Sequence, residues 1–288
     1  AAFIGADLGI AGTAEIALTA GFGMGFAHNA VAQLVIFAFG TEFHDFTGEF
    51  VTEDHGRLSV MVKGGGSKRA GTTDPCTQLF TYGNYELYRG KGGDLYWFRG
   101  GSVLIPFYGV TADITRMALA TYLCDVTDDL TPEEAAEEET SLLLKMLLNS
   151  LYVLNNGQKP PNLVKSVFEF RSAALMGYCP DLSGCALCGE ESPENAYFDI
   201  MNGRIICADC QTKRNRLSDV RQVEEALRER SVICPMTSSV LAALRFILSA
   251  PDKKIFSFSM KDTEEEHALD RVTETFLLNQ LERDFETL

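Results

Sequence analysis

The apolar positions between residues 50 and 110 have the pattern of short β-strands. Runs of aromatic and β-branched residues alternate there with Gly-rich turns, which is typical of a small barrel or sandwich. Strands are expected at residues 58–63, 78–88 and 95–99. Further towards the N-terminus, residues 32–39 are apolar enough to form a buried strand.

Beyond residue 110 the apolar positions recur at the spacing of amphipathic helices. Helices are expected at residues 114–124, 141–154, 162–176, 217–230, 236–249 and 263–288. Thr131, Pro132 and Glu134 indicate a further helix start, because Thr caps a helix, Pro suits its first turn and Glu completes a capping box.

Charge is distributed unevenly along the 288 residues. The formal net charge is −15, which taken alone argues against a nucleic-acid-binding protein. Residues 57–123, however, carry eight basic and four acidic residues, a net of +4, whereas residues 1–56 contain no Lys or Arg. The basic middle part indicates either a polyanion-binding face or a chance asymmetry.

Four cysteines follow the pattern C-x2-C-x18-C-x2-C, at Cys185, Cys188, Cys207 and Cys210. Each C-x2-C turn brings two thiolates together, and two such turns complete the tetrahedron that zinc prefers. Asn202-Gly203 between them predicts a hairpin that returns the second turn to the first. We therefore predict a structural zinc site, with a redox pair and an iron–sulfur cluster as alternatives.

The remaining cysteines do not extend this pattern. They are expected to be buried small hydrophobic residues: Cys76, Cys124, Cys179 and Cys234.

Motifs for catalysis are missing from the sequence. The four histidines form no HExxH pair, and no GxSxG elbow is present. Residues 64–68, Gly-Gly-Gly-Ser-Lys, are similar to a P-loop but lack its Gly-Lys-Ser/Thr order. We therefore expect a protein that is not an enzyme. The apolar runs are too short for a membrane span, and the N-terminus lacks a basic signal-peptide region, so a cytoplasmic location is expected.

Aromatic residues are interleaved with the cations of the basic part. They are Phe80, Tyr82, Tyr85, Tyr88, Tyr96, Trp97 and Phe98. Single-stranded nucleic acid needs cations for its phosphates and flat side chains for its bases, but aromatic residues also fill the core of a small barrel. Alternation places Tyr96 and Phe98 on one face of their strand and Trp97 on the other, and the sequence leaves open which face is inside.

The order of these parts, with several short motifs, resembles the bacterial RecO family of DNA repair and recombination mediators. The motifs are Thr52-Glu-Asp-His-Gly-Arg-Leu58, Lys63-Gly with Ser67-Lys-Arg69, Leu87-Tyr-Arg-Gly-Lys91, Gly177-Tyr178 with Pro180-Asp-Leu182, Cys185-Ala-Leu-Cys-Gly189, Gly203 with Cys207 and Cys210, and Leu281-Glu-Arg283. The resemblance covers roughly residues 50–288.

The resemblance implies an α+β fold: a small OB-fold β-barrel, then a helical domain with an embedded four-cysteine zinc finger. The expected parts are residues 1–40 as an unmatched Gly/Ala-rich segment, 41–112 as the barrel, 113–180 and 215–288 as the two parts of the helical domain, and 181–214 as the zinc finger. Residues 1–40 are either an extension or the product of a wrong start or reading frame. The first barrel strand is either supplied by residues 32–39 or missing.

The resemblance also implies function and partners. Such proteins bind single- and double-stranded DNA, anneal complementary strands, partner RecR, and engage the acidic tail of single-strand-binding protein to help RecA replace it. The expected DNA-binding residues are Lys63, Lys68, Arg69, Arg89, Lys91 and Arg99. Lys165, Phe168 and Arg171 are the expected pocket for the tail, because an acidic, Phe-ended tail needs a cation beside an apolar slot.

Two other classes of function compete with this interpretation. One is a zinc-ribbon protein–protein scaffold without DNA affinity of its own. The other is a redox or metal sensor, which would require labile thiols at the four clustered cysteines.

Overall fold

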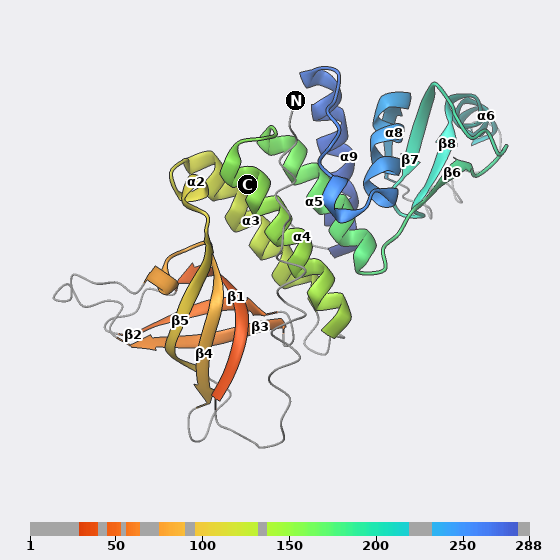
Figure 1. Ribbon diagram of the computed structural model, residues 1–288. Helices are drawn as coiled ribbons and strands as arrows, with labels where there is room; N and C mark the ends of the chain where they lie inside the picture. Colours follow the sequence, from red (N-terminus) through yellow and green to blue (C-terminus); the bar gives the residue numbers. More distant parts are fainter. Residues whose placement is uncertain are drawn as a thin grey trace.

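The computed structural model describes residues 29–39, 45–52, 56–63, 75–89, 96–131, 137–218 and 232–281. They form a β-barrel, a group of helices and a small sheet, with the helices between the other two (Figure 1). No helix in these ranges is both long and apolar enough to cross a membrane.

Five strands form the barrel. They are β1 (Asn29–Phe39), β2 (Asp45–Thr52), β3 (Gly56–Lys63), β4 (Thr81–Arg89) and β5 (Tyr96–Pro106). They pair in the order β1-β2-β3-β5-β4, and β1 also pairs with β4, so the sheet closes on itself. The strand expected at residues 32–39 is present and supplies a wall of the barrel. The barrel therefore includes residues from Asn29 onwards, whereas the resemblance implied a barrel that begins at residue 41.

The barrel interior is filled by alternate residues of its strands. Val60, Tyr85 and Leu87 are buried together with Cys76 from the short 3-10 helix η1 (Pro75–Thr77). Tyr96 and Phe98 pack against this cluster. The face of β5 that carries these two side chains is therefore the inner one, and Trp97 lies on the outer face.

The helical part follows the barrel without a break. It contains α2 (Tyr108–Thr111), α3 (Ile114–Leu130), α4 (Glu137–Asn156), α5 (Pro161–Leu175), α8 (Ser238–Ser249) and α9 (Thr263–Leu281), with a 3-10 turn η2 (Asp252–Lys254). Short sequence signals determine where two of these helices begin. Asp113 accepts hydrogen bonds from the N–H groups of Thr115 and Arg116, and Pro161 occupies the first turn of α5.

Several helix predictions differ from the structure in their bounds. α3 continues past residue 124 to Leu130, because Val126 and Leu130 are buried against the core. Thr131 is the C-cap of α3, and residues 132–136, where the predicted helix start falls, lie outside the described residues. Most of the helix expected at 217–230 and the end of the one expected at 263–288 also lie outside them.

One hydrophobic core joins all three parts. Phe80, Tyr82 and Phe107, at the end of the barrel, belong to the same buried cluster as the helices. Phe170 of α5, Phe198 of the small sheet and Phe276 of α9 pack with ring centroids 5.4–6.4 Å apart. The barrel and the small sheet are therefore both anchored on the helices.

The small sheet holds four strands. They are β6 (Asp181–Cys185), β7 (Asn195–Asp199), β8 (Arg204–Cys207) and β9 (Ile233–Thr237), in the order β6-β8-β7-β9. The predicted hairpin at Asn202-Gly203 is confirmed, and Gly203 has the positive φ of +57° that such a turn requires. β9 lies outside the range 181–214 expected for this module, and its last residues occupy the start of the helix expected at 236–249.

Candidate functional site

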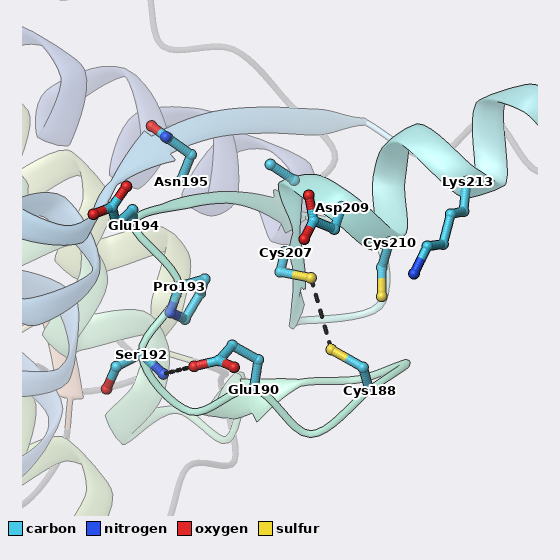
Figure 2. A pocket seen from close by; sticks show the side chains of 11 residues that line it. Cys188, Glu190, Ser192, Pro193, Glu194, Asn195, Cys207, Asp209, Cys210 and Lys213 are labelled. Atoms are coloured by element: carbon cyan, nitrogen blue, oxygen red, sulfur yellow. Dashed lines mark hydrogen bonds between the residues drawn. The ribbon is translucent and has the colours of Figure 1, made fainter.

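The four clustered cysteines meet at one point beside the small sheet. Their sulfur atoms, from Cys185, Cys188, Cys207 and Cys210, all lie within 4.8 Å of one another. The sulfurs of Cys188 and Cys207 are 3.7 Å apart (Figure 2). Residues far apart in the sequence thus form a group that could hold a metal ion.

Each cysteine is placed by the end of a regular element. Cys185 is the last residue of β6, Cys207 is the last residue of β8, and Cys210 lies in the first turn of α6 (Ala208–Ser218). Gly189, at a φ of +78°, donates its N–H to the carbonyl of Cys185 and closes the first turn. The backbone conformation is therefore sufficient to bring the thiols together.

The environment of Cys185 favours a thiolate. Burial alone would raise its pKa, but N–H groups of Cys207, Leu187 and Cys188 point at the sulfur and lower the pKa to about 6. The pKa of Cys210 is raised, because its thiol donates hydrogen bonds to the sulfurs of Cys207 and Cys188. Cys185 is thus the thiol of the cluster that most readily loses its proton, and a metal cation binds cysteine in its thiolate form.

The other four cysteines stand apart from this cluster. Cys76, Cys124 and Cys234 are buried, as predicted. The prediction is wrong for Cys179, which is exposed because it lies in the loop between α5 and β6.

A pocket of about 430 Å³ opens next to the cysteine cluster. Cys188, Cys207 and Cys210 line one side of it, and the carboxylates of Glu190, Glu194 and Asp209 surround the rest (Figure 2). Among the lining residues that the structure describes, Lys213 of α6 is the one cation. The surroundings of the cluster are therefore acidic, which favours a bound metal cation over a phosphate group.

Arg245 of α8 connects the helices to residues 181–214, which carry the four clustered cysteines and are called the cysteine module below. Its Nε donates to the carbonyl of Leu182 at 2.7 Å, and its Nη2 donates to the carbonyls of Ser183 and Glu191 at 3.0 and 2.6 Å. These contacts hold β6 and the loop before β7 against α8.

The predicted DNA-binding residues lie along the barrel as far as the structure describes them. Arg99 is exposed on β5, Lys63 ends β3 and Arg89 ends β4. Arg99 is the extra residue of a β-bulge, because Leu87 pairs with Phe98 while Glu86 pairs with Gly100. Lys68, Arg69 and Lys91 lie outside the described residues.

Of the three residues predicted to form a tail pocket, Lys165 and Phe168 are buried in the helical part and Arg171 is half-buried there. Phe168 is fully buried, and Lys165 bonds Asp270 and Glu274 of α9 at 2.9 and 2.8 Å. Arg171 donates to the carbonyls of Ile247 and Leu248. The ammonium of Lys165 and the Nη1 of Arg171 are engaged by neighbouring helices, and Lys165 and Phe168 are too deeply buried to surround a surface slot.

Sequence reasoning missed the group of polar residues around Lys165. Glu169 is fully buried and accepts hydrogen bonds from the hydroxyls of Tyr122 and Thr273 at 2.5 and 2.9 Å. Burial raises the pKa of Glu169 to about 7, against the opposing charge of Lys165. The only sequence signal was the i, i+4 spacing of Lys165 and Glu169 on one helix.

Family models match nearly the whole of the described chain. The model for the C-terminal part of recombination protein O matches residues 111–288, and the model for the N-terminal part matches residues 45–107. The chain belongs to the recombination protein O family. The boundary between the two matches falls where the barrel gives way to the helices.

Curated relatives carry the family name. The chain is similar to DNA repair protein RecO of Acetivibrio thermocellus, with 26% identity over 237 residues, or 82% of this chain and 85% of the relative. DNA repair protein RecO of Symbiobacterium thermophilum is 28% identical over 56% of this chain and 62% of its own length. DNA repair protein RecO of Listeria monocytogenes serotype 4b is 29% identical over 62% of this chain and 67% of its own length.

Proposed function

We propose that this protein is a DNA repair and recombination mediator that binds single- and double-stranded DNA and anneals complementary strands. Family membership over both the barrel and the helical part is the observation that carries this proposal. In this role it would help RecA replace single-strand-binding protein, in partnership with RecR, at the nucleoid in the cytoplasm. The protein would act by binding and positioning strands, not as an enzyme.

The barrel is the proposed DNA-binding part, and we assign it to the OB-fold. Its strand order β1-β2-β3-β5-β4 supports this assignment, and OB-folds are used widely for single strands. Lys63, Arg89 and Arg99 lie on its strands, and Lys68, Arg69 and Lys91 belong to the two segments that leave β3 and β4. Residues 124–288 carry a net charge of −12, which argues for DNA contact at the barrel alone.

Annealing follows from the same electrostatics. Cations on the barrel displace counterions from phosphates, so affinity is expected to fall steeply with salt. Two complementary strands held on one neutralising surface repel each other less than they do in solution, and they pair faster. The partner that carries an acidic tail would bind elsewhere on the chain, since Lys165 and Phe168 are buried.

The metal that we propose for the cysteine cluster is a structural zinc ion. Four sulfurs at about 2.3 Å from zinc in a tetrahedron lie about 3.8 Å apart, close to the 3.7 Å between Cys188 and Cys207. Four thiolates leave no position for a substrate. The ion would hold β6, β8 and the start of α6 together.

Fluorescence anisotropy of a labelled single-stranded oligonucleotide at two salt concentrations tests the DNA-binding proposal. We expect tight binding at low salt that weakens as salt rises. The triple variant Lys68→Glu, Arg69→Glu, Lys91→Glu should bind far more weakly, whereas charge reversals at two exposed positions in the helical part, Lys254→Glu and Lys261→Glu, should not.

The zinc content of the same sample and a strand-annealing assay complete the test. One zinc per chain with salt-sensitive binding and faster annealing would support the mediator. One zinc per chain with no binding would contradict it and would favour the protein–protein scaffold.

A further inference from the structure

Three outward residues line up across neighbouring strands of the barrel. Trp97 of β5 pairs with Met61 of β3 on one side and with Tyr88 of β4 on the other. Their sequence neighbours Val60, Leu87, Tyr96 and Phe98 pack into the barrel core, so by alternation these three residues belong to the outer face. The row therefore faces away from the barrel interior.

The rings of Tyr88 and Trp97 are nearly parallel. Their centroids are 6.4 Å apart with an interplanar angle of 19°. At that separation parallel rings are offset rather than superposed, so the overlap covers only part of each ring face. Both side chains are half-buried, which leaves a partly exposed aromatic surface on the sheet.

Cations lie close to this pair in the sequence, and one of them, Arg99, is exposed on the same strand as Trp97. Arg99, exposed at the bulge of β5, follows Trp97 by two residues, and Arg89 follows Tyr88 directly. Lys63 ends β3 two residues after Met61. One carboxylate interrupts the pattern, since Glu86 is exposed two residues before Tyr88 on the same strand. Aromatic rings beside backbone-binding cations are the combination that single strands require.

We propose that Tyr88 and Trp97 form a platform on which a base of single-stranded DNA stacks. This proposal rests on the proposed function and names the residues that separate single strands from duplex. Stacking needs an open base face, which duplex DNA does not offer, whereas the phosphate-binding cations act on both. The platform therefore adds affinity for single strands only, and for any base, because every base has a π-face.

Trp97 is the only tryptophan in the chain, so intrinsic tryptophan fluorescence reports on the platform alone. We would titrate the full-length protein with oligo(dT) and with a duplex of equal length, following tryptophan emission and anisotropy together. Emission should be quenched by oligo(dT) with the same midpoint as the anisotropy, and the duplex should quench it far less.

Variants then test whether the contact contributes to affinity. Trp97→Leu and Tyr88→Leu should each weaken oligo(dT) binding by about 5- to 100-fold and leave duplex affinity within about twofold. Trp97→Phe keeps an aromatic ring and should retain most of the affinity. The matched control is Tyr108→Leu, because Tyr108 is 61% exposed on α2 and lies outside the row. Unchanged duplex affinity would also show that each variant is folded.

The possible results distinguish a failure of the stacking platform from a failure of the proposed mediator function. Salt-sensitive oligo(dT) binding without quenching, and without loss in the leucine variants, would overturn the platform and leave the mediator in place. Equal losses for oligo(dT) and duplex would also overturn it, since they would indicate a general role in the barrel. Failure of the wild-type protein to bind either DNA would overturn both proposals.

Discussion

The ammonium nitrogen of Lys165 lies 3.3 Å from Oε1 of Glu169, one turn along α5, and both side chains are almost completely shielded from solvent. The same nitrogen lies within 2.9 Å of carboxylate oxygens of Asp270 and Glu274 on α9. Burial opposes the charge on Lys165, but these carboxylates raise its pKa above the ordinary value. One cation therefore balances three acids between two helices, and its loss should be costly.

Replacing Lys165 with Met tests that balance. The variant keeps an apolar stem but leaves Glu169 buried without its cation, which should lower the free energy of unfolding by about 3–5 kcal/mol. Urea denaturation followed by circular dichroism would measure the change. Lys261→Met, at an exposed position before α9, should change stability little. Equal stabilities of the two variants would contradict the shared-cation arrangement.

Glu169 should give the protein an unusual dependence of stability on pH. Its pKa is about 7 in the folded protein, above its ordinary 4.5, so its protonated form favours folding. This contribution is full below about pH 4.5 and is lost as pH rises through 7. The difference corresponds to about 3 kcal/mol at most. The size of this contribution to stability depends on the groups that face Glu169. They are Lys165, Tyr122, Asp270 and Glu274.

Glu169→Gln removes this titration. Thermal unfolding between pH 5 and pH 8 should show a smaller loss of stability in the variant than in the wild type. Glu264→Gln, exposed in the first turn of α9, should follow the wild-type profile. Parallel profiles for all three proteins would rule out Glu169 as the titrating group.

Metal removal should destabilise the cysteine module and leave DNA binding in place. A chelator should lower the melting temperature of the wild type by several degrees, because ligands held together by the ion would then be released. Cys188→Ser should have a low melting temperature from the start, little bound zinc, and no response to chelator. Cys179→Ser replaces an exposed cysteine outside the cluster and should behave as the wild type. A chelator-resistant Cys188→Ser protein that retains full zinc would contradict this assignment.

Arg245→Met should loosen the cysteine module from α8. The variant loses three hydrogen bonds from one guanidinium to backbone carbonyls, at a cost of about 1–3 kcal/mol for partly exposed groups. Hydrogen–deuterium exchange should speed up across residues 181–194 and stay unchanged in the barrel. Arg271→Met, exposed on α9, is the control. Uniform exchange rates in both variants would show that Arg245 does not anchor the module.

Glu86→Gln should strengthen DNA binding. Its carboxylate is exposed on β4 near Tyr88 and repels phosphates, so its removal should raise affinity about two- to fivefold at low salt. The gain should shrink as salt rises, because screening weakens the repulsion. Anisotropy titrations at two salt concentrations would measure it, with Glu190→Gln beside the cysteine cluster as the control. A loss of affinity would place DNA on another face of the barrel.

Local signals in the sequence were enough for four of the barrel strands, the hairpin and the cysteine cluster, but not for β2. Asn202-Gly203 fixes its turn through backbone preferences, and C-x2-C spacing fixes which thiols meet. The outer face of β5 could not be predicted in the same way, because a strand carries two faces and only its partners show which one is buried. The packing of Tyr96 and Phe98 against the barrel core settled that Trp97 lies outside.

The environment of Lys165 depended on long-range packing. Its partners on α9 lie more than a hundred residues further along the chain, so its spacing from Phe168 on α5 indicated only a shared helix. An amphipathic pattern does not distinguish a cation beside an open slot from one enclosed by a second helix. β9 was missed because it is short and contains Pro235, which suits an edge strand but interrupts the usual strand pattern.

The position of β9 constrains how the cysteine module could have been acquired or exchanged. Its strands β6, β7 and β8 come from one stretch, but β9 follows α6 and leads directly into the Thr237 cap of α8. Transfer of only the cysteine-bearing stretch to another protein would leave the edge of β7 unpaired. It would also leave β9, before α8, without its partner strand. The cysteine module therefore cannot be exchanged without β9. Recombination between relatives would need crossover points on both sides of residues 181–237.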